Sequence, residues 1–290
     1  MSTEIADRST ADIDLLTIRQ IMERINQQDE IPHQAVKQAL PDIEPVVEFI
    51  VAHFPRGGRI LYVAAGTSGR IAVMDAAECP PTFGIAPDRV QVRMAGGEKA
   101  IFHAAEGQED DREAGRRAVA QWNAGKNDCV IGIAASGRTP YVLAALDEAK
   151  KEGAYTALIS SNPVAGGTAD SCIYLATGAE VLTGSTRMKA GTAAKMVLNM
   201  ITTTAFLKLG RTFGNRMCYI QASNEKLKNR IVQTLSESCG ISTQSAAKLL
   251  ADCDGEAAVA LTAGISGKSP MQARADLNKT EGVVRDAIRL

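Results

Sequence analysis

The spacing of apolar residues predicts a run of helices over residues 1–55. In the segment ADIDLLTIRQIMERINQQD (11–29), either Asp12 or Asp14 is placed to cap a helix. The apolar side chains of this segment recur near helical spacing, at Ile13, Leu16, Ile21 and Ile25. Two further segments, PHQAVKQAL and PDIEPVVEFIVAHF, each open with a proline, as helices often do.

After residue 55 the apolar pattern changes to that of β-strands. Five short runs of β-favouring residues follow, and helical segments or glycine-rich turns separate them. These runs are RILYVAA (59–65), RVQVRMA (89–95), DCVIGIAA (128–135), AYTALISS (154–161) and SCIYLAT (171–177). Strands that alternate with helices predict a parallel sheet, and near-continuous apolar strands fit a sheet covered on both faces. The predicted fold class is therefore α/β.

From about Thr186 the pattern is helical to the end of the chain. One long helix is predicted over 186–210, closed by Gly210. Polar residues interrupt its apolar run, which favours a buried domain helix over a membrane helix. Shorter helices follow from about residue 221, and the last three or four are predicted to form a small lobe after Gly240. Three residues are predicted to be N-caps of these helices, namely Ser242, Asp254 and Ser269.

Composition narrows the classes of function. The 290 residues carry a formal net charge of -1, so the sequence lacks the excess of basic residues expected for binding to nucleic acid or to an anionic membrane. The acidic, polar start does not resemble a signal peptide, and no 18-residue apolar run predicts a transmembrane helix. Six scattered cysteines without a C-x-x-C pair argue against a zinc site and suit reduced thiols in the cytosol.

Two loops share one pattern that suits a phosphate. Each follows a predicted strand and precedes a predicted helix, so that free helix amides, glycines and hydroxyls meet at one point. A third segment, LTGSTRMKAGT (182–192), opens the long helix with further hydroxyl and basic groups. The candidate phosphate-binding residues are Gly66, Thr67, Ser68, Gly69, Ser136, Gly137, Arg138, Thr139, Ser185, Thr186 and Lys189.

These loops differ from the common nucleotide-binding motifs. Neither reads G-x-x-x-x-G-K-[ST] or G-x-G-x-x-G, which disfavours a P-loop NTPase and a dinucleotide-binding protein. Hydroxyl residues before a helix can also be simple caps, but two such loops and a basic third segment favour a ligand. The sequence therefore predicts a site for a small phosphorylated molecule.

The carboxylate Glu78 stands alone in MDAAECPPTFG (74–84). Pro80 and Pro81 are expected to end the helix here, which puts an acid at the unfavourable end of the helix dipole. Nine residues separate Gly69 from Glu78, or about 14 Å of helix. At that distance Glu78 can face the carbon chain of a sugar whose phosphate is bound by residues 67–69.

A second acidic group lies in EGQEDD (106–111), which contains Glu109. A charge run of this kind is usually a solvated helix start, but two carboxyl groups at one substrate would form a proton-transfer pair. Of the three histidines, His33 and His53 are expected to be peripheral, and His103, nearer the acidic group, has no Ser or Cys partner at a recognisable spacing. A hydrolase triad is therefore not expected.

Four segments together resemble the N-acetylmuramic acid 6-phosphate etherases, which belong to the sugar-isomerase (SIS) fold superfamily. They are AGTSGRIAVMDAAECPPTFG, EGQEDD, ASGRTPYV and LTGSTRMKAGTAAKMVLNM. The resemblance covers essentially the whole chain and is dense from Gly66 to Met200. It implies a doubly wound parallel sheet flanked by helices, with a small C-terminal helical domain, and a homodimer. The corresponding division is an N-terminal helical segment (1–55), an SIS domain that binds a sugar phosphate (56–219) and a C-terminal helical region (220–290).

The resemblance also implies an activity. The family cleaves the ether between D-lactate and C3 of the amino sugar, which yields N-acetylglucosamine 6-phosphate and D-lactate without a cofactor or metal. Such a lyase acts in the recycling or catabolism of cell-wall amino sugars, in the cytoplasm. The family's motifs place the catalytic acid on Glu78 and the second catalytic glutamate on Glu109.

Two other functions are compatible with the same fold. An aldose–ketose phosphate isomerase also needs a base near C2 of a sugar phosphate. A non-catalytic sugar-phosphate sensor would use the phosphate loops alone, but it has no need of both Glu78 and Glu109.

Overall fold

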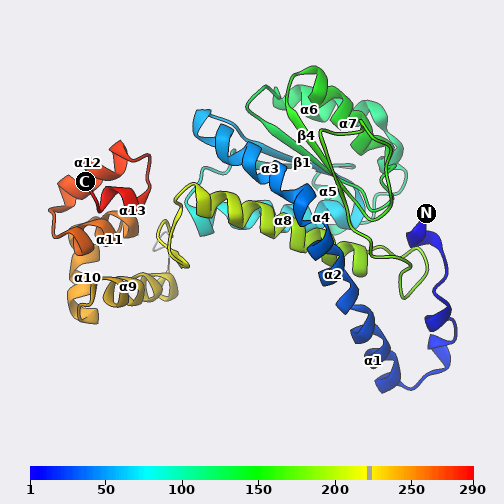
Figure 1. The fold of residues 1–290 in the computed structure, drawn as a ribbon, viewed down its shortest axis with the longest axis horizontal. Coiled ribbons are helices and arrows are strands. Elements are labelled where there is room, and N and C mark those ends of the chain that lie inside the picture. Colours follow the sequence, from blue (N-terminus) through cyan, green and yellow to red (C-terminus); the bar gives the residue numbers. More distant parts are fainter. Residues whose placement is uncertain (221–223) are drawn as a thin grey trace. The chain divides into compact units, whose positions relative to one another are not determined.

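A computed structural model describes residues 1–220 and 224–290 of the chain. Its centre is a parallel five-stranded sheet in the order β2-β1-β3-β4-β5 (Figure 1). All five predicted strands are confirmed, each slightly shorter than its apolar run. They are β1 (Ile60–Ala64), β2 (Val90–Met94), β3 (Cys129–Ile133), β4 (Tyr155–Ser160) and β5 (Ser171–Tyr174).

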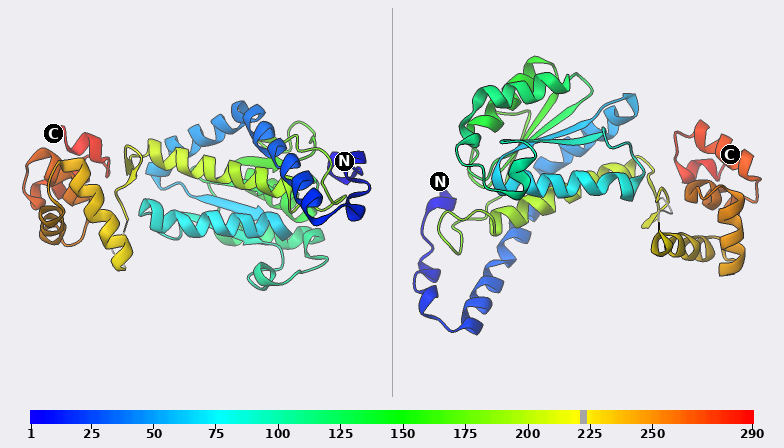
Figure 2. Two further views of the ribbon diagram at one scale, coloured as in Figure 1. Left: turned by 90° about the horizontal axis from the view of Figure 1, so that it is seen from below. Right: turned by 180° about the vertical axis from the view of Figure 1, so that it is seen from behind.

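Helices cover both faces of the sheet, as the apolar strands predicted (Figure 2). Leu61 and Val63 of β1 belong to a buried cluster with α6 (Arg112–Trp122) and α7 (Pro140–Lys151). The side chain between them, Tyr62, points to the other face and is fully buried there. That face is covered by α3 (Leu40–His53), the first part of α4 (Gly66–Phe83) and the first part of α8 (Lys189–Lys208).

The strand order reverses between β1 and β3, which pair in parallel with Ala64 opposite Ile133. The chain leaves β1 into α4 on one face and leaves β3 into α7 on the other face. A crevice therefore opens at the carboxyl ends of these two strands, which is where ligands bind in open α/β sheets.

The predicted end of the helix at Pro80 is wrong. Helix α4 continues through Pro80 and Pro81 to Phe83, and the Gly84 amide then donates to the Pro80 carbonyl at 2.9 Å. A proline φ suits a helix, and the missing amides cost less than the packing that the last turn gains. Phe83 is buried against Phe206, with ring centroids 4.7 Å apart.

The N-terminal helices differ from the prediction in their starts. Three short 3-10 turns come first: η1 (Ser2–Glu4), η2 (Arg8–Thr10) and η3 (Ile13–Leu15). Helix α1 (Ile18–Gln28) is capped by Thr17 and not by Asp12 or Asp14, because Thr17 and Gln20 form a reciprocal capping box. Helix α2 (Glu30–Gln38) begins two residues before Pro32.

The chain forms two compact units. The first contains residues 1–76 and 88–202, and the second contains residues 77–87 and 203–290. Short elements of the first unit are η4 (Phe54–Arg56), α5 (Lys99–Phe102) and η5 (Gln108–Asp110). In the second unit, α8 ends at Lys208, close to the predicted stop at Gly210, and an unpredicted hairpin follows, with strands β6 (Thr212–Phe213) and β7 (Arg216–Met217).

Five helices complete the second unit: α9 (Glu225–Cys239), α10 (Thr243–Asp252), α11 (Ala257–Ser266), α12 (Pro270–Lys279) and α13 (Val284–Ala287). The predicted caps Ser242 and Ser269 are confirmed. Asp254 is not a cap, because it takes a left-handed turn at φ 56° and Glu256 precedes α11 instead. The first residues of the predicted C-terminal helical region, 221–223, lie outside the described residues.

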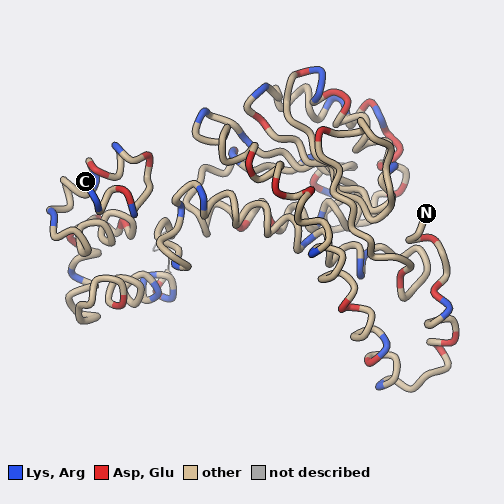
Figure 3. Tube along the Cα trace, in the orientation of Figure 1, with Lys and Arg blue, Asp and Glu red and all other residues tan. Residues whose placement is uncertain are grey.

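Lys and Arg are interspersed among Asp and Glu along the described chain (Figure 3). Within the described ranges, no helix has both the length and the apolar character needed to cross a membrane.

A buried carboxylate ties three elements of the first unit together. Asp75 of α4 accepts hydrogen bonds from the Tyr62 hydroxyl at 2.8 Å, from Asn199 Nδ2 at 2.6 Å and from Thr202 Oγ1 at 3.1 Å. A buried acid is costly unless its oxygens are satisfied, and these three donors satisfy them. The network joins β1, α4 and α8 on one face of the sheet.

We expect Asp75→Ala to lower the free energy of unfolding by about 3 kcal/mol, because it removes the buried carboxylate that accepts hydrogen bonds from Tyr62, Asn199 and Thr202. The single tryptophan, Trp122, is buried in the first unit, so its fluorescence during urea unfolding measures this loss. The exposed Asp147→Ala is the control and should stay within about 0.5 kcal/mol of the unaltered protein. Equal stabilities of the two variants would contradict the role of Asp75.

Candidate active site

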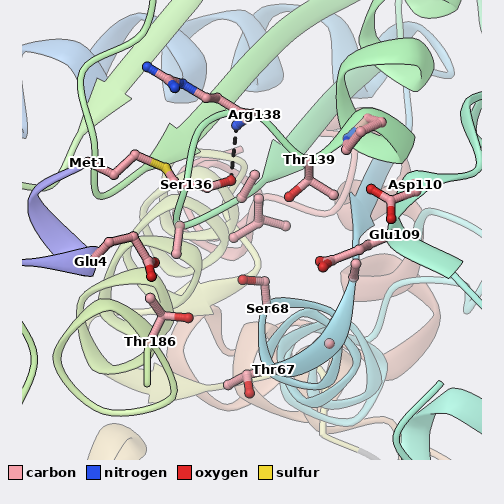
Figure 4. A pocket seen from close by; sticks show the side chains of 16 residues that line it. Met1, Glu4, Thr67, Ser68, Glu109, Asp110, Ser136, Arg138, Thr139 and Thr186 are labelled. Carbon is pink, nitrogen blue, oxygen red and sulfur yellow. Dashed lines mark hydrogen bonds between the residues drawn. The ribbon is translucent and has the colours of Figure 1, made fainter. Parts of the chain in front are cut away.

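A cavity of about 360 Å³ lies where the loops after β1 and β3 meet (Figure 4). Its walls come from both predicted phosphate loops, from the turn η5, from the loop before α8 and from the first residues of the chain. Among the predicted phosphate-binding residues, the cavity brings together Gly66, Thr67, Ser68, Ser136, Arg138, Thr139 and Thr186.

The loop after β1 presents the start of α4 to the cavity. The first amides of a helix have no partner within it, so those of Gly66, Thr67 and Ser68 are placed to bind an anion. The Gly69 amide already donates to the Ala65 carbonyl at 3.3 Å. A Cβ at Gly69 would lie 2.7 Å from the Met94 side chain, so this glycine allows α4 to pack closely against β2.

The loop after β3 presents hydroxyl groups to the cavity, whereas the exposed side chain of Arg138 points away from it (Figure 4). Ser136 Oγ accepts a hydrogen bond from the Arg138 amide at 3.1 Å, which shapes the turn and leaves the hydroxyl proton free to be donated. Gly137 has φ 69°, and a Cβ there would collide with Val164. Thr139 precedes α7, and its side chain makes no capping hydrogen bond, so its hydroxyl is available to a ligand.

The third predicted segment, residues 182–192, contributes fewer residues to the cavity than its sequence predicted. Thr186 lines the wall, whereas Lys189 is buried elsewhere, with Nζ 2.5 Å from Gln28 Oε1. Both oxygens of the buried Glu180 accept from the first amides of α8, those of Lys189 and Ala190, at 3.0 Å. The start of α8 is therefore bound by a side chain of the protein itself. Burial lowers the pKa of Lys189.

The predicted second catalytic glutamate, Glu109, borders the cavity. It lies on η5, and its carboxylate points into the cavity on the same side as Asp110 (Figure 4). It also lines a second cavity of about 200 Å³, which shares Ala65 and Gly66 with the first. A group bound across the two cavities would therefore pass beside Glu109.

Glu78, the predicted catalytic acid, is exposed on α4 and belongs to the second unit. It is not among the described residues that line either cavity. Its pairing with Glu109 at one substrate stays a prediction. Of the predicted phosphate-binding residues, Gly69, Gly137, Ser185 and Lys189 also lie outside the lining of the larger cavity.

The first residues of the chain supply a wall that the sequence did not predict. Met1 and Glu4 line the larger cavity, and long-range hydrogen bonds fix their segment. The Ser2 amide donates to Asn162 Oδ1 at 2.6 Å, and Asn162 Nδ2 donates to Thr3 Oγ1 at 2.9 Å. A polar segment near a terminus shows no periodicity, so no sequence signal marks such a contact.

The side chains of the cavity define its possible chemistry. Helix amides and hydroxyls can bind a phosphate, while carboxylates can accept or donate protons. Across residues 1–220 and 224–290, His, Cys, Asp and Glu side chains form no group of three that could hold a metal ion.

The fold and this cavity define an α/β protein of the SIS type. The profile of the "Glucokinase regulatory protein N-terminal SIS domain" matches residues 42–150. A putative phosphosugar isomerase structure from Bacteroides fragilis is similar with 20% identity and a TM-score of 0.49, over 67% of this chain and 98% of that one.

Full-length relatives identify the family. An N-acetylmuramic acid 6-phosphate etherase from Geobacillus thermodenitrificans is 46% identical over 99% of this chain and 98% of its own length. One from Rhodopirellula baltica is 46% identical over 97% of this chain and 94% of its own length. The chain belongs to the N-acetylmuramic acid 6-phosphate etherase family.

We expect Ser68→Ala to weaken the binding of a sugar phosphate by about 1.5–3 kcal/mol, the range for a hydrogen bond to a charged group. Ser136→Ala should have a similar effect, and calorimetry with N-acetylglucosamine 6-phosphate measures both. Ser266→Ala, in the second unit, is the matched control. If the phosphorylated and unphosphorylated sugars bind equally well, the cavity does not hold a phosphate.

Proposed function

We propose that this protein cleaves the lactyl ether of N-acetylmuramic acid 6-phosphate to N-acetylglucosamine 6-phosphate and D-lactate. The observation that carries the proposal is the cavity itself, in which two anion-binding loops meet the acid Glu109. The etherase relatives, which are similar over nearly the full chain, support the choice of substrate. The reaction belongs to the recycling or catabolism of cell-wall amino sugars, and we assign it to the cytoplasm.

The phosphate anchors the substrate at the loops after β1 and β3. The amides at the start of α4 and the hydroxyls of Ser68, Ser136 and Thr139 surround this end of the cavity. A helix start suits an anion because its amides are unpaired and its dipole end is positive. Binding energy from the phosphate then holds the carbon chain of the sugar beside Glu109.

The ether leaves by elimination from the open-chain aldehyde. Glu109 removes the proton from C2, the C3–oxygen bond breaks, and a double bond forms between C2 and C3. Glu78 protonates the departing lactate oxygen. Water then adds its hydroxyl to C3 and a proton returns to C2, so the net change is the addition of one water. The position of Glu109 on both cavities supports its role, and the motif ECPPTFG supports that of Glu78.

The reaction and the two roles are tested together in heavy water. Deuterium should appear at C2 of the product, because the abstracted proton exchanges before it returns. Glu109→Gln should abolish both exchange and turnover. Glu78→Gln should lower turnover by at least ~10²-fold, as for a lost general acid, yet retain slow exchange at C2 of the substrate. The exposed Glu44→Gln is the control.

A different experimental result would contradict each part of this proposal. Absence of D-lactate with the unaltered protein would contradict the activity. The opposite exchange pattern in the two variants would reverse the roles of Glu78 and Glu109. A product without deuterium, together with no isotope effect from C2-deuterated substrate, would contradict the elimination.

We further propose that the protein is a homodimer in which α1 packs against a second copy. Helix α1 has no buried residue in the single chain. Its apolar side chains follow the i, i+3, i+4, i+7 spacing of a helix face that packs against another surface, at Ile18, Ile21, Met22 and Ile25. Ile18 is 79% exposed and Met22 is 58% exposed, which supports a partner on this face.

Light scattering should give about twice the 30.7 kDa mass of one chain. Met22→Asp should shift the protein toward the single-chain mass, because it places a charge in the packed face. Gln27→Asp, at an exposed polar position of the same helix, should leave the mass unchanged. A single-chain mass for the unaltered protein would contradict the dimer.

A further inference from the structure

Glu4 projects into the larger cavity from a segment that is distant in sequence from every other wall (Figure 4). Hydrogen bonds of the adjacent residues Ser2 and Thr3, and not of the Glu4 side chain itself, fix its position. Thr3 is fully buried, and its carbonyl accepts from the Gly184 amide at 3.2 Å. With the bonds of Ser2 and Thr3 to Asn162, these contacts fix Glu4 over the loop before α8.

The carboxylate of Glu4 is unused within the protein. It accepts no hydrogen bond from the described part of the chain, and one oxygen would lie 3.1 Å from a Cβ placed on Gly184. In Figure 4 it lies beside Thr186, across the cavity from Glu109. The cavity therefore has acids on two opposite sides and the phosphate loops between them.

The charge of Glu4 determines what can bind beside it. An ionised carboxylate only accepts hydrogen bonds, and it repels another anion at short range. The phosphate of the ligand must therefore lie away from Glu4, at the loops after β1 and β3. The group opposite Glu4 has to be a hydrogen-bond donor, and an amino sugar offers hydroxyl groups and an amide N–H.

We propose that Glu4 is a specificity-determining residue that accepts a hydrogen bond from a hydroxyl or amide N–H of the amino sugar. The inference rests on the proposed sugar-phosphate ligand of this cavity. In this arrangement the segment 1–4 acts as a wall that orients the sugar, with its phosphate toward Ser68 and Ser136. Glu4 selects the ligand and takes no part in the proton transfers.

Calorimetry with two probes tests this role. Glu4→Ala should raise the Kd for N-acetylglucosamine 6-phosphate by about 10- to 100-fold, as expected for a lost charge-assisted hydrogen bond. The same change should leave the Kd for inorganic phosphate unchanged or lower it, because an acid that repels the anion is removed. Glu4→Gln, which keeps an acceptor oxygen, should have a smaller effect on the sugar phosphate.

Two further variants distinguish a direct contact between Glu4 and the sugar from a general effect of removing an acid. Thr3→Val retains the shape of a buried side chain but loses the acceptor for Asn162, so it should weaken sugar-phosphate binding in the same direction as Glu4→Ala. Glu44→Ala, an exposed acid on α3, should change neither Kd. An unchanged sugar-phosphate Kd in Glu4→Ala would overturn the proposal, and so would a parallel rise of both Kd values.

The outcome is distinguishable from failure of the proposed reaction. D-lactate release by the unaltered protein decides the reaction and does not involve Glu4. If lactate is released but Glu4→Ala keeps the original KM and Kd, the role of Glu4 is excluded while the reaction stands. If no lactate is released but the two probes respond as expected, Glu4 stands as a sugar contact. No measurable binding of the sugar phosphate by the unaltered protein would overturn the role of Glu4.

Discussion

The parallel pairing of β1 with β3 is the constraint on which the site depends. Ala64 lies opposite Ile133, so both strands end at the same level of the sheet. The helices that follow pack on opposite faces, and neither can cover the crevice between the two strands. The free amides of α4 and the hydroxyls before α7 therefore face one cavity. This arrangement does not depend on the conformation of the other loops.

The charges of the cavity lining indicate which groups would bind the phosphate and which would face the carbon chain of the sugar. Arg138 is the one cationic side chain in the described lining and points away from the cavity in Figure 4, whereas Glu4, Glu109 and Asp110 are acids. In the proposed complex the phosphate is therefore bound mainly by amides and hydroxyls, which attract an anion without a full charge. The acids lie on turns away from those amides and are available to the carbon chain of the sugar. Lys189 and Glu180 are used inside the protein instead, where Lys189 contacts Gln28 and Glu180 accepts from the first amides of α8.

Errors of the sequence prediction arose where tertiary contacts outweighed a local rule. Pro80 and Pro81 normally stop a helix, but packing of Phe83 on Phe206 extends α4 beyond them. Asp12 and Asp14 are good capping residues, but Thr17 with Gln20 satisfies two backbone amides at once. Lys189 has the character of a phosphate ligand, but it is buried beside Gln28, which is 161 residues away in the chain.

The sequence by itself determined the five strands, the parallel α/β class and the two loops at the carboxyl ends of β1 and β3. These features follow from local periodicity and from the short range of turn and helix-start preferences. Only the tertiary structure decided that Glu109 borders two cavities, that Asp75 joins β1 to α4 and α8, and that Glu4 forms a wall of the site. Such contacts join residues far apart in the chain, such as Ser2 with Asn162, and depend on how whole elements pack. No local pattern records them, because burial and distance are properties of the folded chain.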